Sequence, residues 1–244
     1  MIKAVIFDLW NTLIEPTDDY HTMKTMKKLF DIPDKVYHEK VKKGLMTNKL
    51  ETMDEILGYM KKEFNIREPR YDDIQEIKKV IKRDSEKVRP YYDAKKTLQD
   101  LKAAGIKTAL ISNAASFHKS PLYDFGLDKY FDHVIFSCDV GYWKPDPEIY
   151  QLALNKLGVS AYRTIMTGDH VKKDYWVPSR MDIKGIHLNR ELTKEYNHPI
   201  RGYKTEIKSL YEIMPIIGDL QKKQQAFREK HPERYESWCN YKGY

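Results

Sequence analysis

The chain has 244 residues, of which 41% are hydrophobic and 32% are charged. This balance excludes a disordered chain and predicts a soluble globular protein, long enough for one sizeable α/β core and a small second unit. The formal net charge of +7 suits an anionic ligand, but the lysines are spread along the chain, which argues against specific nucleic-acid binding.

No apolar run approaches the length of a membrane span, and the N-terminal residues lack the pattern of a signal peptide. We therefore expect a cytoplasmic protein with no membrane partner. Two cysteines, Cys138 and Cys239, have neither a disulfide framework nor a metal-ligand spacing, and we expect both to be reduced. The sequence does not indicate an oligomeric state.

The first segment with a clear pattern is residues 4–7, an unbroken apolar run typical of a parallel strand covered on both faces. Asp8 follows it directly. A charge at this place is costly unless it has partners or a function, and ligands of open α/β sheets bind at the carboxyl ends of strands. Asp8 is therefore a candidate functional residue; the alternative is an aspartate that caps a turn.

Residues 16–88 change to helical periodicity and are rich in Lys and Glu, which predicts a small helical insert. Three apolar faces recur at helical spacing: Tyr20, Met23, Met26, Leu29 and Phe30; then Met53, Ile56, Leu57, Met60 and Phe64; then Ile74, Ile77, Val80 and Ile81. Most of these side chains are expected to form the core of the insert itself.

From residue 88 onward, strands and helices alternate, since Pro90 blocks a continued helix and a new helix begins near Asp93. The expected strands are 106–111, 131–137, 164–167, 185–188 and 203–207, with helices from about 93 to 105 and 145 to 157, and a short one ending near Gly218. The alternation predicts an α/β fold with a doubly wound, mostly parallel, Rossmann-like sheet. Residues 219–244 are expected to form a polar C-terminal helix or tail.

Polar residues follow the later strands, as Asp8 follows the first. Ser112 and Asn113 end one strand, Asp169 ends another, and Asp174 comes five residues later. Because parallel strands bring their carboxyl ends to one edge, Asp8, Ser112 and Asp169 should converge. Two or three carboxylates with a main-chain carbonyl make a hard oxygen site of the kind that Mg2+ prefers.

The order and spacing of these segments resemble the haloacid dehalogenase superfamily. The matching motifs are Asp8 to Thr12, Ser112, Lys144 in the run Lys-Pro-Asp-Pro, and Gly168-Asp169 with Asp174. The resemblance covers residues 1 to about 217, apart from the detail of 14–89. It implies a core domain of residues 1–15 and 89–218, and a cap domain of residues 16–88 that covers an active site.

The resemblance also implies roles. Asp8 is expected to be the nucleophile of a Mg2+-dependent phosphatase that acts on a small phosphorylated molecule. Lys144, Ser112 and the backbone around Thr12 would hold the phosphoryl group, and Asn113, Lys144 and Trp10 would contact substrate. The expected metal ligands are Asp8, Asp169, the main-chain carbonyl of Trp10, and Asp174, which is either a ligand or an anchor behind the ligands.

The sequence departs from the phosphatase pattern at Trp10, where these enzymes usually carry a second aspartate that protonates the leaving group. Losing such an acid typically costs about 10²- to 10⁴-fold in rate. His118, His170, Tyr142 and Glu15 are possible substitutes that the sequence does not rank. Asn11 replaces a common glycine, which a left-handed backbone position would tolerate.

Two other functions therefore stay open. An aromatic residue at position 10 is typical of the 2-haloacid dehalogenases of the superfamily, but these lack the Gly-Asp metal motif and place an arginine soon after the first motif, whereas the first arginine here is Arg67. A catalytically weak scaffold that binds a phospholigand or a protein partner is the third possibility. Val177, Pro178 and Asp182, which diverge from the family pattern after the fourth motif, favour it.

Overall fold

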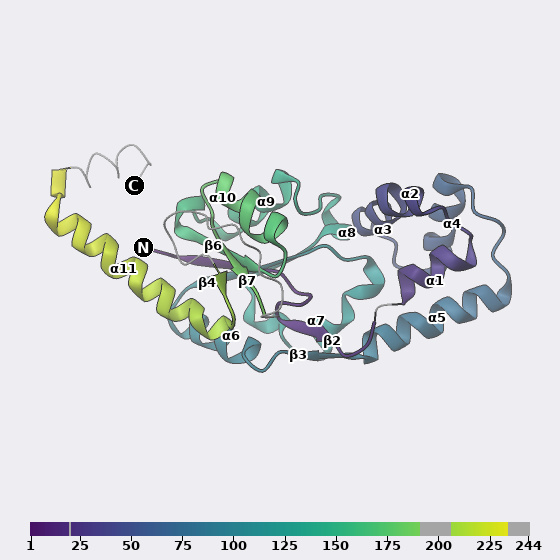
Figure 1. The fold of residues 1–244 in the computed structure, drawn as a ribbon, viewed down its shortest axis with the longest axis horizontal. Helices are drawn as coiled ribbons and strands as arrows, with labels where there is room; N and C mark the ends of the chain where they lie inside the picture. Colours follow the sequence, from purple (N-terminus) through teal and green to yellow (C-terminus); the bar gives the residue numbers. More distant parts are fainter. Residues whose placement is uncertain (20, 191–205, 234–244) are drawn as a thin grey trace.

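The computed structural model describes residues 1–19, 21–190 and 206–233, and within them a six-stranded parallel sheet carries helices on both faces (Figure 1). Its strands are β1 (Ala4–Phe7), β4 (Lys107–Ser112), β5 (His133–Phe136), β6 (Thr164–Gly168), β7 (Lys184–Leu188) and β8 (Glu206–Ile207). The order across the sheet is β5-β4-β1-β6-β7-β8. Numbered along the chain within this sheet, that order is the Rossmann order, in which the crevice lies beside the first strand. The predicted fold class is confirmed.

The central strand β1 is buried on both faces because successive side chains point in opposite directions. Val5 and Phe7 pack in one hydrophobic cluster with α6 (Ala94–Ala103) and α11 (Ile213–Lys230), whereas Ala4 and Ile6 pack in a second cluster with α9 (Pro147–Leu157). The shorter helical segments of the core are η2 (Ser116–His118), α7 (Ser120–Asp124), η3 (Asp128–Tyr130), α8 (Ser137–Val140), η4 (Ala161–Arg163), η5 (Val171–Trp176), α10 (Val177–Arg180) and η6 (Leu210–Glu212).

The helical insert, residues 21–86, packs around a third hydrophobic cluster, which Ala115 and Phe117 of the core also join. The three predicted apolar faces lie on α1 (Thr22–Leu29), α4 (Met53–Phe64) and α5 (Tyr71–Glu86), and three further segments join them: α2 (Asp34–Val36), η1 (Tyr37–Val41) and α3 (Lys42–Thr47). The sequence analysis missed these three. Their buried residues Tyr37, Val41 and Leu45 recur every fourth position among many charged residues.

Two antiparallel strands, β2 (Ile14–Pro16) and β3 (Val88–Pro90), connect the insert to the core. Glu15 accepts a hydrogen bond from Arg89 Nε across this ribbon at 2.7 Å. Sequence alone did not predict the ribbon, because each strand has three residues and its partner lies far away in the chain. The division of the chain into two domains at these strands stays a prediction.

The C-terminal helix corrects one expectation. We expected a helix ending near Gly218, but α11 runs from Ile213 to Lys230. Glycine ends a helix when its backbone turns left-handed; in a helix interior it costs only about 1 kcal/mol relative to alanine. Two expected segments lie partly outside the described residues: the last strand at 203–205 and the tail at 234–244, which includes Cys239. Cys138 is a buried free thiol. In the described part of the chain, no helix has both the length and the apolarity needed to cross a membrane.

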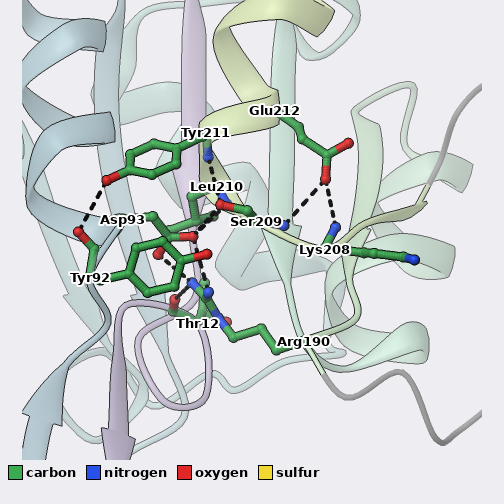
Figure 2. A network of polar contacts seen from close by, with 9 residues as sticks. All are labelled: Thr12, Tyr92, Asp93, Arg190, Lys208, Ser209, Leu210, Tyr211 and Glu212. Carbon is green, nitrogen blue, oxygen red and sulfur yellow. Dashed lines mark hydrogen bonds and ion pairs between the residues drawn. The ribbon is translucent and has the colours of Figure 1, made fainter.

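A buried ion pair joins the two ends of the ribbon to the sheet (Figure 2). Arg190, just after β7, donates to Asp93 through both terminal nitrogens at 3.0 and 2.8 Å, and one of them also donates to the carbonyl oxygen of Thr12 at 2.7 Å. The guanidinium lies 3.7 Å from the centre of the Tyr91 ring. Thr12 precedes β2 and Asp93 follows β3, so this one side chain holds both strands where they leave the core.

Asp93 has further donors in the segment before α11. It accepts from Ser209 Oγ at 2.7 Å and from the Leu210 main-chain nitrogen at 2.9 Å (Figure 2). Burial raises the pKa of Asp93, but the bonds from Arg190 and Ser209 lower it by more, so the pKa lies below its usual value. The carboxylate is therefore charged and satisfied although it is fully buried.

We predict that Asp93→Asn lowers the free energy of unfolding at pH 7 by about 3–5 kcal/mol, because Arg190 is left as a buried charge without its partner. The pKa of Asp93 is lowered on folding, so its contribution is present above the unfolded pKa of about 3.9 and is lost as the pH falls through the folded value. Urea unfolding at pH 7 and at successively lower pH should therefore show the deficit of the variant shrinking below about pH 4.

Glu15→Gln is the matched control, because it breaks an ion pair whose arginine is well exposed and should cost less than about 1 kcal/mol. If Asp93→Asn costs no more than this control, the buried ion pair is not what holds the ribbon.

Candidate functional site

The strand ends bring the predicted residues together at one edge of the sheet. Asp8 follows β1, Ser112 ends β4 and Asp169 follows β6, and β1 lies between the other two strands. Asp8, Asp169 and Asp174 each offer a carboxylate oxygen within 4.8 Å of the others. Since β1 is paired with β4 and β6 in parallel register, the convergence follows from the sheet order.

Lys144 reaches this cluster from the loop before α9 and is almost fully buried. Its ammonium nitrogen lies 2.7 Å from Asp8 Oδ1 and 2.8 Å from Asp174 Oδ1. The main chain of Lys144 is held by Asn113, which donates to its carbonyl oxygen and accepts from its amide, both at 2.7 Å. These two bonds position Lys144. Asn113 also lines a cavity beside Asp8, and its contact with substrate stays a prediction.

The charges of the cluster are strongly coupled. Burial raises the pKa of Asp8, which Lys144 only partly offsets. Burial would lower the pKa of Lys144, but Asp174 and Asp8 outweigh it and raise the pKa, so the side chain stays an ammonium. Burial, Asp8 and Asp174 raise the pKa of Asp169 to about 7, because Lys144 and a hydrogen bond from Asn11 offset them only in part. Three carboxylates around one ammonium leave an excess of negative charge that a cation would relieve.

Asp174 also fixes the loop after β6. Its Oδ2 accepts from the main-chain nitrogen of His170 at 3.0 Å while Oδ1 accepts from Lys144. Gly168 is required beneath it, because a Cβ built there would lie 2.9 Å from the Asp174 Cβ. Asn11 donates to Asp169 Oδ2 at 3.4 Å and has the expected left-handed backbone, with φ of 57°.

Ser112 and Thr12 each have a hydroxyl group without a hydrogen-bond partner among the described residues, but neither residue lines the cavity beside Asp8. Ser112 Oγ and Thr12 Oγ1 are both fully buried. A buried hydroxyl without a partner costs free energy, so native structures seldom leave one unless a ligand or water completes it. Both residues were predicted to lie at the site.

A cavity of about 510 Å³, here called the central cavity, opens above the cluster between the core and the insert. The core contributes Asp8, Trp10, Asn11, Asn113, His118, Trp143, Lys144, Asp169, His170 and Lys173, and the insert contributes Met23, Lys42 and Met46. Sequence analysis missed Trp143, Lys173 and the three insert residues, because only the packing of the insert on the core decides which of its side chains face Asp8. Arg190 was also missed, although its place after a strand is the same signal that identified Asp8.

The possible substitutes for the missing acid fall into two groups. His118 and His170 line the central cavity; burial lowers the pKa of His118 to about 4 and also lowers that of His170. The His118 ring meets the Trp10 ring edge-on, with centres 6.2 Å apart. Tyr142 is half exposed and Glu15 is paired in the ribbon, and neither lines the central cavity.

Comparison with known proteins agrees with this arrangement. A family model described as haloacid dehalogenase-like hydrolase matches residues 2–177. A glyceraldehyde 3-phosphate phosphatase from Methanocaldococcus jannaschii is 25% identical over 241 residues, which span 91% of this chain and 100% of that protein.

Two solved structures share the fold. A phosphatase of the family from Thermococcus onnurineus has a TM-score of 0.60 at 24% identity, and the match covers 89% of this chain and 98% of that one. A family enzyme from Bacteroides thetaiotaomicron, solved with magnesium and inorganic phosphate, has a TM-score of 0.59 at 17% identity, covering 82% of this chain and 100% of that one. The family model spans well over half of the sequence, including every predicted motif, so the chain belongs to the haloacid dehalogenase-like hydrolases.

Proposed function

We propose that the protein is a Mg2+-dependent phosphatase that hydrolyses a small phosphorylated molecule through Asp8. The observation that carries the proposal is the buried contact of Lys144 with Asp8 and Asp174 beside the high-pKa carboxyl of Asp169. Lys42 and Lys173 add positive charge to the walls of the central cavity, which favours an anionic substrate. The similarity to a named phosphatase over almost the whole chain supports the same reaction class.

The donor set fits Mg2+. Three carboxylates that each offer an oxygen within 4.8 Å of the others are the hard oxygen donors that Mg2+ prefers. Asp8, Asp169 and the main-chain carbonyl of Trp10 would hold the ion, with Asp174 as the third carboxylate and as the anchor of Lys144. When bound, the ion would cancel the repulsion between the carboxylate nucleophile and the phosphoryl group.

The protein groups then have distinct tasks. An oxygen of Asp8 attacks phosphorus, and the bond from phosphorus to the leaving oxygen breaks with its electron pair remaining on that oxygen. Lys144, Ser112 and the backbone around Thr12 would donate to the phosphoryl oxygens. Water then attacks the aspartyl phosphate, which releases inorganic phosphate and restores Asp8.

The second candidate is hydrolysis of a carbon–halogen bond, and Trp10 is the observation that favours it. The carboxylate triad argues against it, since a halide leaving group needs neither a metal nor a proton. No arginine lines the described part of the central cavity to clamp a carboxylate. The catalytically weak scaffold is the third candidate, and the buried, fully assembled Lys144 cluster argues against it.

The role of the insert is likewise a proposal. We infer that residues 16–88 act as a cap, because Met23, Lys42 and Met46 help to close the central cavity and the ribbon of β2 and β3 is the covalent link that would flex.

Mg2+ binding should depend on pH through Asp169. With a pKa of about 7 in the metal-free protein, Asp169 must lose its proton to bind the ion, so affinity should rise by about tenfold from pH 6 to pH 8 and level off above the pKa. Titration calorimetry in buffers of different ionisation enthalpy measures both the affinity and the proton release. Asp169→Asn should abolish the pH dependence along with tight binding; unchanged Mg2+ affinity in this variant would show that the ion binds elsewhere.

Trp10 predicts a preference for good leaving groups, because no carboxylic acid at position 10 can protonate a poor one. Aryl phosphates should be hydrolysed with a much higher kcat/KM than alkyl phosphates. Trp10→Asp should narrow this gap, with the gain on alkyl phosphates bounded by about 10²- to 10⁴-fold.

Asp8→Asn is the control for this comparison and should abolish both activities. Equal rates on alkyl and aryl phosphates in the unmutated protein would mean that another residue is the acid. Halide release from a 2-haloacid without metal, and no phosphatase activity, would replace the phosphatase with the dehalogenase.

A further inference from the structure

Two large apolar side chains of the central cavity have no place in a hydrophobic core. Trp143 and Met46 are partly buried and line the cavity, yet among the described residues neither belongs to, or packs against, any of the three core clusters. Trp10 and Met23, by contrast, pack at the edge of a cluster while also lining the cavity. Four apolar side chains therefore surround a cavity whose floor is charged.

These side chains come from both walls of the cavity. Met46 lies on α3 of the insert, and Trp143 lies in the loop that leads from α8 to Lys144 in the core. α3 and α8, the helix just before this loop, are in contact, and their labels lie together in Figure 1. The ammonium of Lys43, also on α3, lies 5.6 Å from the centre of the Trp143 ring, which is within range of a cation–π contact. This contact links α3 of the insert to the loop of the core that carries Trp143.

The central cavity is also much larger than a phosphoryl group needs. Its volume of about 510 Å³ leaves room for the leaving group beside the phosphoryl site. The parts of Trp143 and Met46 that still face this space would be stabilised by an apolar surface that covers them. Methionine adapts to a flat ring through favourable sulfur–aromatic contacts, and tryptophan stacks on one.

We propose that the substrate is a phosphate monoester of a phenol. Its ring would bind between Trp143 and Trp10 on the core side and Met46 and Met23 on the insert side. This inference rests on the proposed phosphatase function. Two arguments favour an aromatic substrate. An aryl oxide can leave without the acid that Trp10 replaces, and the apolar wall residues would bind a ring better than a small polar alcohol. Trp143 and Met46 are then specificity residues that touch the leaving group and leave the phosphoryl group to Asp8 and Lys144.

Binding of two non-hydrolysable phosphonates tests the ring site without turnover. With Mg2+ present, calorimetry should give an affinity for phenylphosphonate at least tenfold higher than for methylphosphonate, as expected for burying a ring. Trp143→Ala and Met46→Gln should remove most of that difference and leave methylphosphonate binding unchanged. Trp143→Phe, which keeps an aromatic wall, should retain it. Trp176→Ala is the matched control. It removes an indole that lines a second cavity but not the central cavity, and it should leave the affinity for both phosphonates unchanged.

Turnover separates the ring from the leaving-group chemistry. Acetyl phosphate has a leaving group that needs no acid and carries no ring, so Trp143→Ala and Met46→Gln should raise KM for 4-nitrophenyl phosphate about tenfold and leave acetyl phosphate kinetics unchanged. Equal affinity for the two phosphonates, with activity on acetyl phosphate intact, would overturn the aromatic assignment and keep the phosphatase. If the protein binds neither phosphonate and hydrolyses neither 4-nitrophenyl phosphate nor acetyl phosphate, the proposed function itself fails.

Discussion

The contact of Lys144 with Asp8 and Asp174 is the interaction on which the rest of the site depends. A buried ammonium and two buried carboxylates are each costly alone, and together they satisfy one another at 2.7 and 2.8 Å. The cluster imposes demands on three separate segments. Asn113 must hold the main chain of Lys144, and Gly168 must leave room for Asp174. The strand β1 must end where Asp8 can reach Lys144 and lie near Asp174. The Rossmann order satisfies all three, because β1 lies between the strands that carry Asn113 and Gly168.

Arg190 has a comparable role at the base of the insert. It holds Thr12 and Asp93, the residues beside the two ribbon strands, while Ser209 and Leu210 complete the shell of Asp93. The turn that carries Trp10 and Asn11 is thereby fixed to the same point as the return strand from the insert. Any movement of the insert about the ribbon would thus start from a base that is bonded to the sheet. Under the proposed function, this would separate a fixed phosphoryl site from an adjustable leaving-group site.

The position of Trp10 links chemistry to specificity. It removes an acid from the site and adds an apolar surface to the cavity, next to His118, whose own pKa is lowered by burial. Under the proposed function, this one residue of the first motif would affect both which group can leave and which substrate can bind. Lys42 and Lys173 add positive charge to walls that also carry apolar side chains, so an anionic group with an apolar body would match this surface better than either property alone.

The sequence by itself determined the sheet, the family and the residues at the strand ends. Apolar runs that stop on a polar group identified Asp8, Ser112 and Asp169, because in a parallel sheet the end of a strand fixes where its next side chain lies. Asn11 replaces a glycine that is common in the family, and its backbone is left-handed, a conformation that asparagine tolerates. Periodicity likewise found α1, α4 and α5, whose apolar faces are long enough to read from one segment alone.

Only the tertiary structure decided the features that need two distant segments at once. The ribbon of β2 and β3, the capture of Asp93 by Arg190 and the contact of Lys43 with Trp143 each join residues more than 70 positions apart, and nothing in either local sequence encodes its partner. The same holds for α11, which continues past Gly218 because a glycine without a left-handed backbone does not end a helix. Local patterns report burial and backbone preference, whereas the pairing of distant side chains is settled by how the insert packs on the sheet.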